Sequence, residues 1–199
     1  GYVMKFAVVG TNFQYVPIAQ RELVSFSDTK KLEMYACMEN IGILYGAIVS
    51  TCNRSEIYFL YEKEEQLCKM KELYLDFFHM KDKNLKIFHK QETEALTYMF
   101  EVCAGLQSLV VGEDQLLGQM AESIQFAKEQ GKCNKVLHKL FQEGIRCAKA
   151  IHRDFKISEH PLSIAYIGIL QLMAHGGIKG KKVMVIGAGN MAYLVMTYV

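Results

Sequence analysis

Residues 43–62 read ILYGAIVSTCNRSEIYFLYE. Two runs rich in β-branched and aromatic residues, 43–50 and 56–62, flank the polar segment TCNRS. Runs of this composition favour strands, and a short polar segment between two of them favours a turn. We therefore predict two consecutive strands with Cys52 in the tight turn between them.

The segments around this pair extend the pattern. By the same criteria we predict further strands at 4–10 and 85–88, and helices at 17–41 and 64–79. The order strand, helix, strand, strand, helix, strand is that of a ferredoxin-like βαββαβ unit. We therefore assign the chain to the α/β (α+β) class, with this unit at the N-terminal end and a helical region over 91–156 after it.

The clearest amphipathic helix is predicted over 133–156. Its apolar face would carry Leu137, Leu140, Phe141, Gly144, Ala148, Ile151 and Phe155. The opposite side has eight basic residues against three acidic ones within 128–156, a local net of +5: Lys128, Lys132, Lys135, Lys139, Arg146, Lys149, Arg153 and Lys156. Lys128 and Lys132 belong to this stripe only if the helix continues through Gly131. The stripe is either the solvated side of an ordinary helix or a surface that follows a phosphate backbone.

Composition limits the class of protein. The chain has 199 residues, of which 51% are apolar and 22% charged, with a formal net charge of +2. These values exclude disorder, and the charge is too small to indicate nucleic acid by itself. No apolar run approaches the ~18 residues that a membrane span needs. Six cysteines without a C-x-x-C pair, in a chain without a signal peptide, predict reduced thiols and a cytoplasmic location.

Cys52 is the candidate nucleophile. A turn between strands is accessible to solvent, and Arg54 two residues later supplies a cation that favours the thiolate. The alternative is that Cys52 is a small buried apolar residue and Arg54 a solvated charge.

A second candidate segment is GLQSLVVGEDQLLGQ at 105–119. Its polar residues could converge on a small ligand, and Gln115 and Gln119 would share a helix face. Glu113 and Asp114 would stand at a helix N-terminus, where capping alone also explains them.

The third candidate segment is VMVIGAGNMA at 183–192. It is predicted to be a strand that leads through the glycine-rich turn G-x-G-x-x-A into a helix. This arrangement is typical of the phosphate-binding turn of a dinucleotide fold. Another apolar helix is predicted at 162–175.

Histidine spacing predicts no zinc site and no other metal site. His89 follows the predicted fourth strand and could approach Cys52 from the next loop; an ordinary surface histidine is the alternative.

These three motifs, in this order, resemble the glutamyl-tRNA reductase family: STCNRSE at 50–56, GLQSLVVGEDQLLGQ at 105–119 and VMVIGAGNMA at 183–192. Weaker support comes from VVGTNFQYVPIAQRELVSF at 8–26 and SIAYIGI at 163–169. Phe13 and Gln14 depart from the histidine and lysine that the family commonly has there.

The resemblance implies an NADPH-dependent oxidoreductase of tetrapyrrole (porphyrin) biosynthesis. Cys52 would attack the ester of glutamyl-tRNA to form a thioester, which hydride from NADPH would reduce to glutamate 1-semialdehyde. His89 matches a histidine important for activity, and Arg54 would pair the glutamyl carboxylate. The implied substrate-binding residues are Thr51, Asn53, Arg54, Ser108, Glu113, Asp114, Gln115 and Gln119, and the implied cofactor-binding residues are Gly187, Ala188, Gly189, Asn190, Met191 and Ala192.

The resemblance also divides the chain into a catalytic domain at 1–157, a linker at 158–178 that begins a spinal helix, and the start of an NADPH-binding domain at 179–199. Because the chain ends soon after the glycine-rich motif, we expect it to perform acyl transfer or ester hydrolysis but not reduction. Implied partners are glutamyl-tRNA, the downstream semialdehyde aminomutase and, for the full-length chain, a second copy. Two alternatives stay open: a charged-tRNA binding module with an inert Cys52, and a thiol acyl-transferring oxidoreductase with a non-RNA substrate.

Overall fold

The computed structural model describes residues 4–12, 14–105, 114–154, 181–188 and 191–198. These residues form two compact units. The first comprises Gly1–Gln91 and Ser123–Leu137, and the second comprises Glu92–Glu122 and His138–Val199. The helices that span 114–154 therefore contribute residues to both units.

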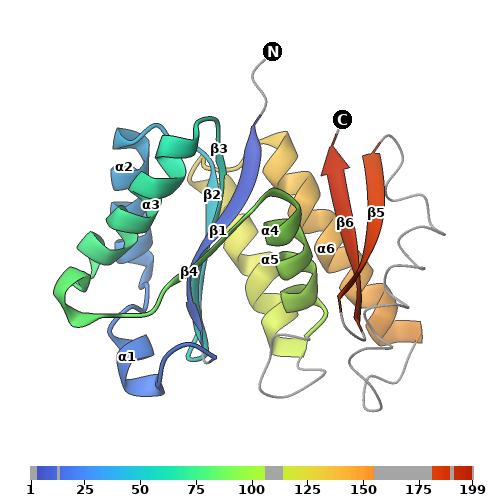
Figure 1. Cartoon of the computed structure of the whole chain (residues 1–199), viewed down its shortest axis with the longest axis horizontal. Helices are drawn as coiled ribbons and strands as arrows, with labels where there is room; N and C mark the ends of the chain where they lie inside the picture. The colour runs from blue at the N-terminus through green and yellow to red at the C-terminus, as the bar shows by residue number, and fades with distance from the viewer. Residues whose placement is uncertain (1–3, 13, 106–113, 155–180, 189–190, 199) are drawn as a thin grey trace. The chain divides into compact units, whose positions relative to one another are not determined.

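The first unit contains a four-stranded antiparallel sheet (Figure 1). Its strands are β1 (Lys5–Asn12), β2 (Gly46–Ser50), β3 (Arg54–Tyr61) and β4 (Phe88–Gln91), in the order β2-β3-β1-β4. The central strands β1 and β3 are buried along almost their whole length, which explains their continuous apolar runs. The prediction of a mixed α/β fold with two strands around the TCNRS turn is confirmed.

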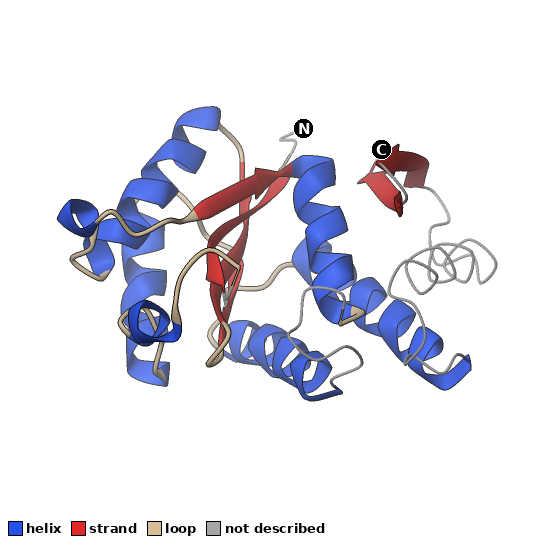
Figure 2. Ribbon diagram, turned by 60° about the horizontal axis from the view of Figure 1, so that its bottom comes forward, coloured by secondary structure: helices blue, strands red, loops and turns tan. Residues whose placement is uncertain are grey.

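Helices α2 (Asp28–Asn40) and α3 (Glu64–Phe77) lie side by side on one face of this sheet (Figures 1 and 2). Buried tyrosines attach them to it, because Tyr35 donates a hydrogen bond to the carbonyl of Gly46 and Tyr74 donates one to the carbonyl of Ser55. The short 3-10 helix η1 (Lys81–Lys83) then leads toward β4.

The single helix predicted over 17–41 is wrong. The chain instead forms a short helix α1 (Ile18–Glu22), an irregular stretch and then α2. Ser27 caps α2, since its hydroxyl accepts a hydrogen bond from the amide of Lys30. Val24 and Phe26, in the irregular stretch, are buried, so core packing and the cap together interrupt the helix.

The fourth strand also differs from its prediction at 85–88, because β4 begins only at Phe88. Phe88 is the first residue of the ladder with β1, where it pairs with Gly10. His89 is therefore inside a strand and not in a loop after one.

The second unit contains α4 (Glu92–Cys103), parts of α5 (Asp114–Glu129) and α6 (Lys135–Asp154), and two strands. The predicted buried face of α6 is confirmed for Leu137, Leu140, Phe141, Gly144 and Ala148. A Cβ added at Gly144 would stand 3.3 Å from the sulfur of Cys103, so α4 and α6 approach closely there. The side chain of Ile151, and Phe155, lie outside the described residues.

Gly131 ends α5 in the left-handed conformation, with φ of 69°. The helix therefore does not continue into α6, and Lys128 and Lys132 are not part of its basic side.

The helix expected after the glycine-rich turn is replaced by a strand. Strand β5 (Lys181–Ala188) pairs antiparallel with β6 (Met191–Tyr198). The run MAYLVMTY is rich in aromatic and β-branched residues, and the Gly-Asn dipeptide before it is a common hairpin signal. Gly189 and Asn190 themselves, and the predicted linker at 158–178 with its helix at 162–175, lie outside the described residues. Among the described helices, none is long and apolar enough to cross a membrane.

Candidate functional site

Cys52 lies at the tip of the turn that joins β2 to β3, and its side chain is exposed. The turn is closed by a hydrogen bond of 2.8 Å from the amide of Thr51 to the carbonyl of Arg54. The Thr51 hydroxyl accepts a second hydrogen bond, of 3.1 Å, from the amide of Asn53. The alternative that Cys52 is buried is therefore wrong, and Thr51 helps to shape the turn.

Arg21 of α1 contacts this turn and was not singled out from the sequence. Its Nε donates a hydrogen bond of 3.1 Å to the carbonyl of Cys52, and its Nη1 donates one of 2.7 Å to the carbonyl of Val16. The residue is 9% exposed. The one sequence signal that could have indicated Arg21 is its place inside the family-like segment 8–26.

Two serines at the ends of the turn bond to the chain just after Arg21. The hydroxyl of Ser50 accepts a hydrogen bond of 2.8 Å from the amide of Phe26, and that of Ser55 donates one of 2.6 Å to the carbonyl of Val24. Tyr74 donates a third, of 2.9 Å, to the Ser55 hydroxyl. Burial raises the pKa of Tyr74 above its ordinary value.

Arg54 is buried, with 1% of its surface exposed, so the alternative of a solvated charge is wrong. Its Nη1 lies 3.4 Å from both carboxylate oxygens of Glu56. Tyr58 donates a hydrogen bond of 3.0 Å to the same carboxylate. These three residues occupy every second position of β3 and therefore share one face of the sheet. Their spacing in the sequence was a signal of this arrangement.

His89 is exposed on β4, where it pairs with Val9 of β1. Val9 in turn pairs with Ile57 of β3, three residues beyond Arg54, which is roughly 10 Å along a strand. The sheet register therefore does not bring the backbone of His89 to the Cys52 turn.

The remaining predicted residues lie in the second unit or outside the described part of the chain. Asp114 is the first residue of α5, Gln115 is exposed and Gln119 is half-buried on the same helix. Gly187 and Ala188 end β5, where they pair with Ala192 and Met191 of β6. Ser108 and Glu113 are outside the described residues. Within the part that is described, no three His, Cys, Asp or Glu side chains group as a metal site would require.

The basic side of α6 is partly neutralised. Glu143, which has 4% of its side chain exposed, lies 2.9 Å from the ammonium of Lys139 and 2.7 Å from the guanidinium of Arg146. Burial by itself would raise the pKa of Glu143, but the hydrogen bonds from Arg146 and Lys139 outweigh it and hold the pKa below its ordinary value. Lys135 and Lys149 are exposed on the same helix.

The antiparallel sheet and the turn at its edge define a mixed α/β protein that presents a cysteine thiol to solvent. The family described as glutamyl-tRNAGlu reductase, N-terminal domain, matches residues 9–155. The chain belongs to this family.

Its relatives agree with that assignment. The chain is 42% identical to the glutamyl-tRNA reductase of Clostridium novyi over 98% of its own length, and 37% identical to that of Alkaliphilus metalliredigens over 97%. It spans 48% and 47% of those two relatives, about half of their length. The fold is similar to glutamyl-tRNA reductase from Methanopyrus kandleri, with a TM-score of 0.66 and 23% identity over 89% of this chain and 41% of that one.

Proposed function

We propose that this chain accepts the glutamyl group of glutamyl-tRNA on Cys52. The sulfur attacks the ester carbonyl, a C–S bond forms and the ester C–O bond breaks. The proton of the thiol passes to the tRNA hydroxyl that leaves. The observation that carries this proposal is the exposed thiol on a turn whose backbone is bonded on both sides. The relatives named above are glutamyl-tRNA reductases, which supplies the substrate.

We propose roles for the neighbours of Cys52 from the same resemblance. Thr51 and Asn53, both half-buried, stand beside the thiol and would line the glutamyl group. Arg54 would bind its carboxylate, but Glu56 already faces Nη1 of Arg54, so the substrate carboxylate would compete with Glu56. For His89, Gln115 and Gln119 the proposal rests on the resemblance alone.

The proposed NADPH site does not fit the chain as it is folded here. A dinucleotide pyrophosphate binds at the N-terminus of a helix that follows a strand. The described chain after β5 is the strand β6, so within the described residues no helix begins after Gly187 and Ala188. We therefore derive no hydride step, and the activity we propose for this chain is acyl transfer, with slow hydrolysis of the thioester.

We also propose that β1 to β4 form a ferredoxin-like unit within a catalytic domain at 1–157, with a linker at 158–178. The strand order β2-β3-β1-β4 with antiparallel neighbours supports this assignment. A cytoplasmic location, the semialdehyde aminomutase and the homodimer remain proposals from the family resemblance.

The test is covalent labelling. The native chain is incubated with glutamyl-tRNA that carries a radioactive glutamyl group, and protein-bound label that thiols release is measured. We expect label on the native chain and on Cys68→Ser, which removes another exposed thiol, but none on Cys52→Ser. Absence of label and of released glutamate with the native chain, or equal label on Cys52→Ser, would exclude the covalent mechanism. The binding-module alternative would then be favoured if glutamyl-tRNA still binds.

A further inference from the structure

Arg21 joins two parts of the chain that are far apart in sequence. One guanidinium donates hydrogen bonds to the carbonyl of Val16, before α1, and to that of Cys52, 31 residues after Arg21. Among the described residues, no carboxylate lies within ion-pairing distance of Arg21. Both hydrogen bonds of this buried guanidinium go to backbone carbonyls, so Arg21 ties the backbones of two separate segments together.

We propose that Arg21 is a positioning residue for the nucleophile, and this rests on the proposed function of Cys52. Its bond to the carbonyl fixes the orientation of the peptide that follows Cys52, and so the direction in which the thiol points. Acyl transfer depends on this direction, because the sulfur must meet the ester carbon along a narrow path.

The rest of the support comes from the chain immediately after Arg21. The amide of Phe26 and the carbonyl of Val24 bond to Ser50 and Ser55, the residues at the two ends of the turn. The segment 21–26 therefore holds the turn at three points: at each end and at its tip. The two serines hold the strands, and of these three contacts it is that of Arg21 that reaches the backbone of the cysteine itself.

The shape of the guanidinium explains why arginine stands there. Nε and Nη1 point in fixed directions from one plane, so a single side chain satisfies both carbonyls at once. A lysine would keep the charge, but its ammonium is a point donor without this fixed geometry. The fixed geometry of the guanidinium should therefore contribute to the positioning of Cys52 beyond the effect of its charge.

The experiment compares Arg21→Met and Arg21→Lys with the native chain. Gln20→Met is the matched control, because Gln20 is the exposed neighbour on α1. The single-turnover rate of Cys52 acylation by glutamyl-tRNA is measured along with tRNA binding, the rate of Cys52 alkylation by iodoacetamide and the melting temperature. We expect Arg21→Met to slow acylation by about 10- to 100-fold, with Arg21→Lys in between and Gln20→Met unchanged. A small reagent needs no fixed direction of attack, so alkylation of Cys52 and tRNA binding should change less than about 3-fold.

Two results of this comparison would overturn the inference. The first is native-rate acylation by Arg21→Met. The second is a slower acylation accompanied by an equally large fold-change in the alkylation rate and by a lower melting temperature. A purely structural role would produce this result.

A measurement without tRNA separates this inference from the proposed function. The amides of Thr51 and Asn53 are hydrogen-bonded within the turn, so their hydrogen exchange reports its order. We expect Arg21→Met to speed the hydrogen exchange of both amides by about 10-fold or more. Gln20→Met should leave both exchange rates unchanged. If the native chain takes up no glutamyl label, the proposed function fails while these amides still report whether Arg21 orders the turn. Unchanged exchange in Arg21→Met would overturn the positioning role.

Discussion

Arg54 and Glu56 form a buried ion pair on β3, with 3.4 Å between Nη1 and Oε2 and side chains that are 1% and 0% exposed. Arg54 follows the turn that carries Cys52, so this pair connects the candidate site to the core of the sheet. Removing one partner of a buried pair leaves the other charge uncompensated, which is far more costly than losing a surface pair.

We therefore predict that Glu56→Gln lowers the free energy of unfolding by about 3 kcal/mol, measured by urea denaturation. Glu62→Gln, at an exposed position just after β3, should change it by less than about 0.5 kcal/mol. Equal effects of the two changes would mean that the buried pair contributes no more than a surface charge.

Gly10 allows β1 and β3 to approach closely. A Cβ at this position would stand 2.2 Å from the carbonyl oxygen of Ser55 and 2.8 Å from the Cα of Glu56, both backbone atoms. Gly10→Ala should therefore destabilise the chain by about 3 kcal/mol or more, since two central strands must separate.

Gly118 provides the matched control for Gly10. It lies in α5, and a Cβ there would meet nothing within 4 Å. Gly118→Ala should raise the unfolding free energy by about 0.5 to 1 kcal/mol, because alanine loses less backbone entropy in a helix. Thermal unfolding of Gly10→Ala and Gly118→Ala tests both expectations. A Gly10→Ala variant as stable as the native chain would contradict the strand register.

Glu143 should make stability depend on pH. Its pKa is below the ordinary 4.5, so the folded chain binds this proton less readily than the unfolded chain. The stabilisation is fully present above about pH 4.5 and is lost as the pH falls through the lower pKa of the folded state.

Glu143→Gln should therefore lower the unfolding free energy by about 1 to 2 kcal/mol at pH 7. The difference from the native chain should shrink as the solution is acidified toward pH 3. Glu33→Gln, exposed on α2, should show neither effect. A difference that stays constant with pH would show that the carboxylate charge is not what stabilises α6.

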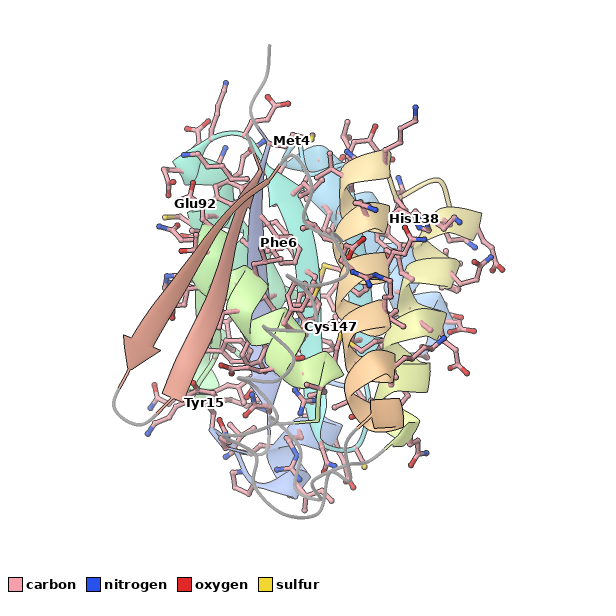
Figure 3. All side chains as sticks on the ribbon, turned by 90° about the vertical axis from the view of Figure 1, so that its right-hand side faces the viewer. Met4, Phe6, Tyr15, Glu92, His138 and Cys147 are labelled. Carbon is pink, nitrogen blue, oxygen red and sulfur yellow. The ribbon has the colours of Figure 1, made fainter. Side chains whose placement is uncertain are left out.

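The cysteines should react in an order set by burial. Cys52 and Cys68 are exposed, whereas Cys103 and Cys147 are buried. Burial raises the pKa of Cys147 to about 12, so its thiolate is scarce at neutral pH. Iodoacetamide at pH 7 should label Cys52 and Cys68 at least about 10-fold faster than Cys147. Peptide mass spectrometry measures the labelling of each cysteine over time. Rapid labelling of Cys147 (Figure 3) would contradict its burial on α6.

The basic side of α6 gives a prediction about RNA. Lys139 and Arg146 are held by Glu143, so Lys135 and Lys149 are the better candidates for phosphate contacts. Lys135→Glu with Lys149→Glu should weaken tRNA binding and reduce its salt slope by about 2. Lys69→Glu, exposed on α3, is the control. Unchanged binding and salt slope would identify this surface as the ordinary solvated side of a helix.

The sequence by itself determined the local elements and the family. Strand-forming runs predicted the β2–β3 pair and its turn at Cys52, periodicity predicted the buried face of α6, and three motifs indicated glutamyl-tRNA reductase. These features depend on residues close together in the chain, so composition and spacing are enough to find them. The helix over 17–41 and the helix after Gly189 were wrong because a cap, buried side chains and strand pairing outweighed local helical preference.

Only the tertiary structure decided which side chains meet at the site. It buried the side chains of Arg54 and Glu56 together, placed His89 within β4 and brought Arg21 to the carbonyl of Cys52. Arg21 and Cys52 are 31 residues apart, and their contact exists because the 21–26 segment folds onto the ends of the turn. A hydrogen bond between such distant residues depends on the path of the whole chain, which no local pattern records.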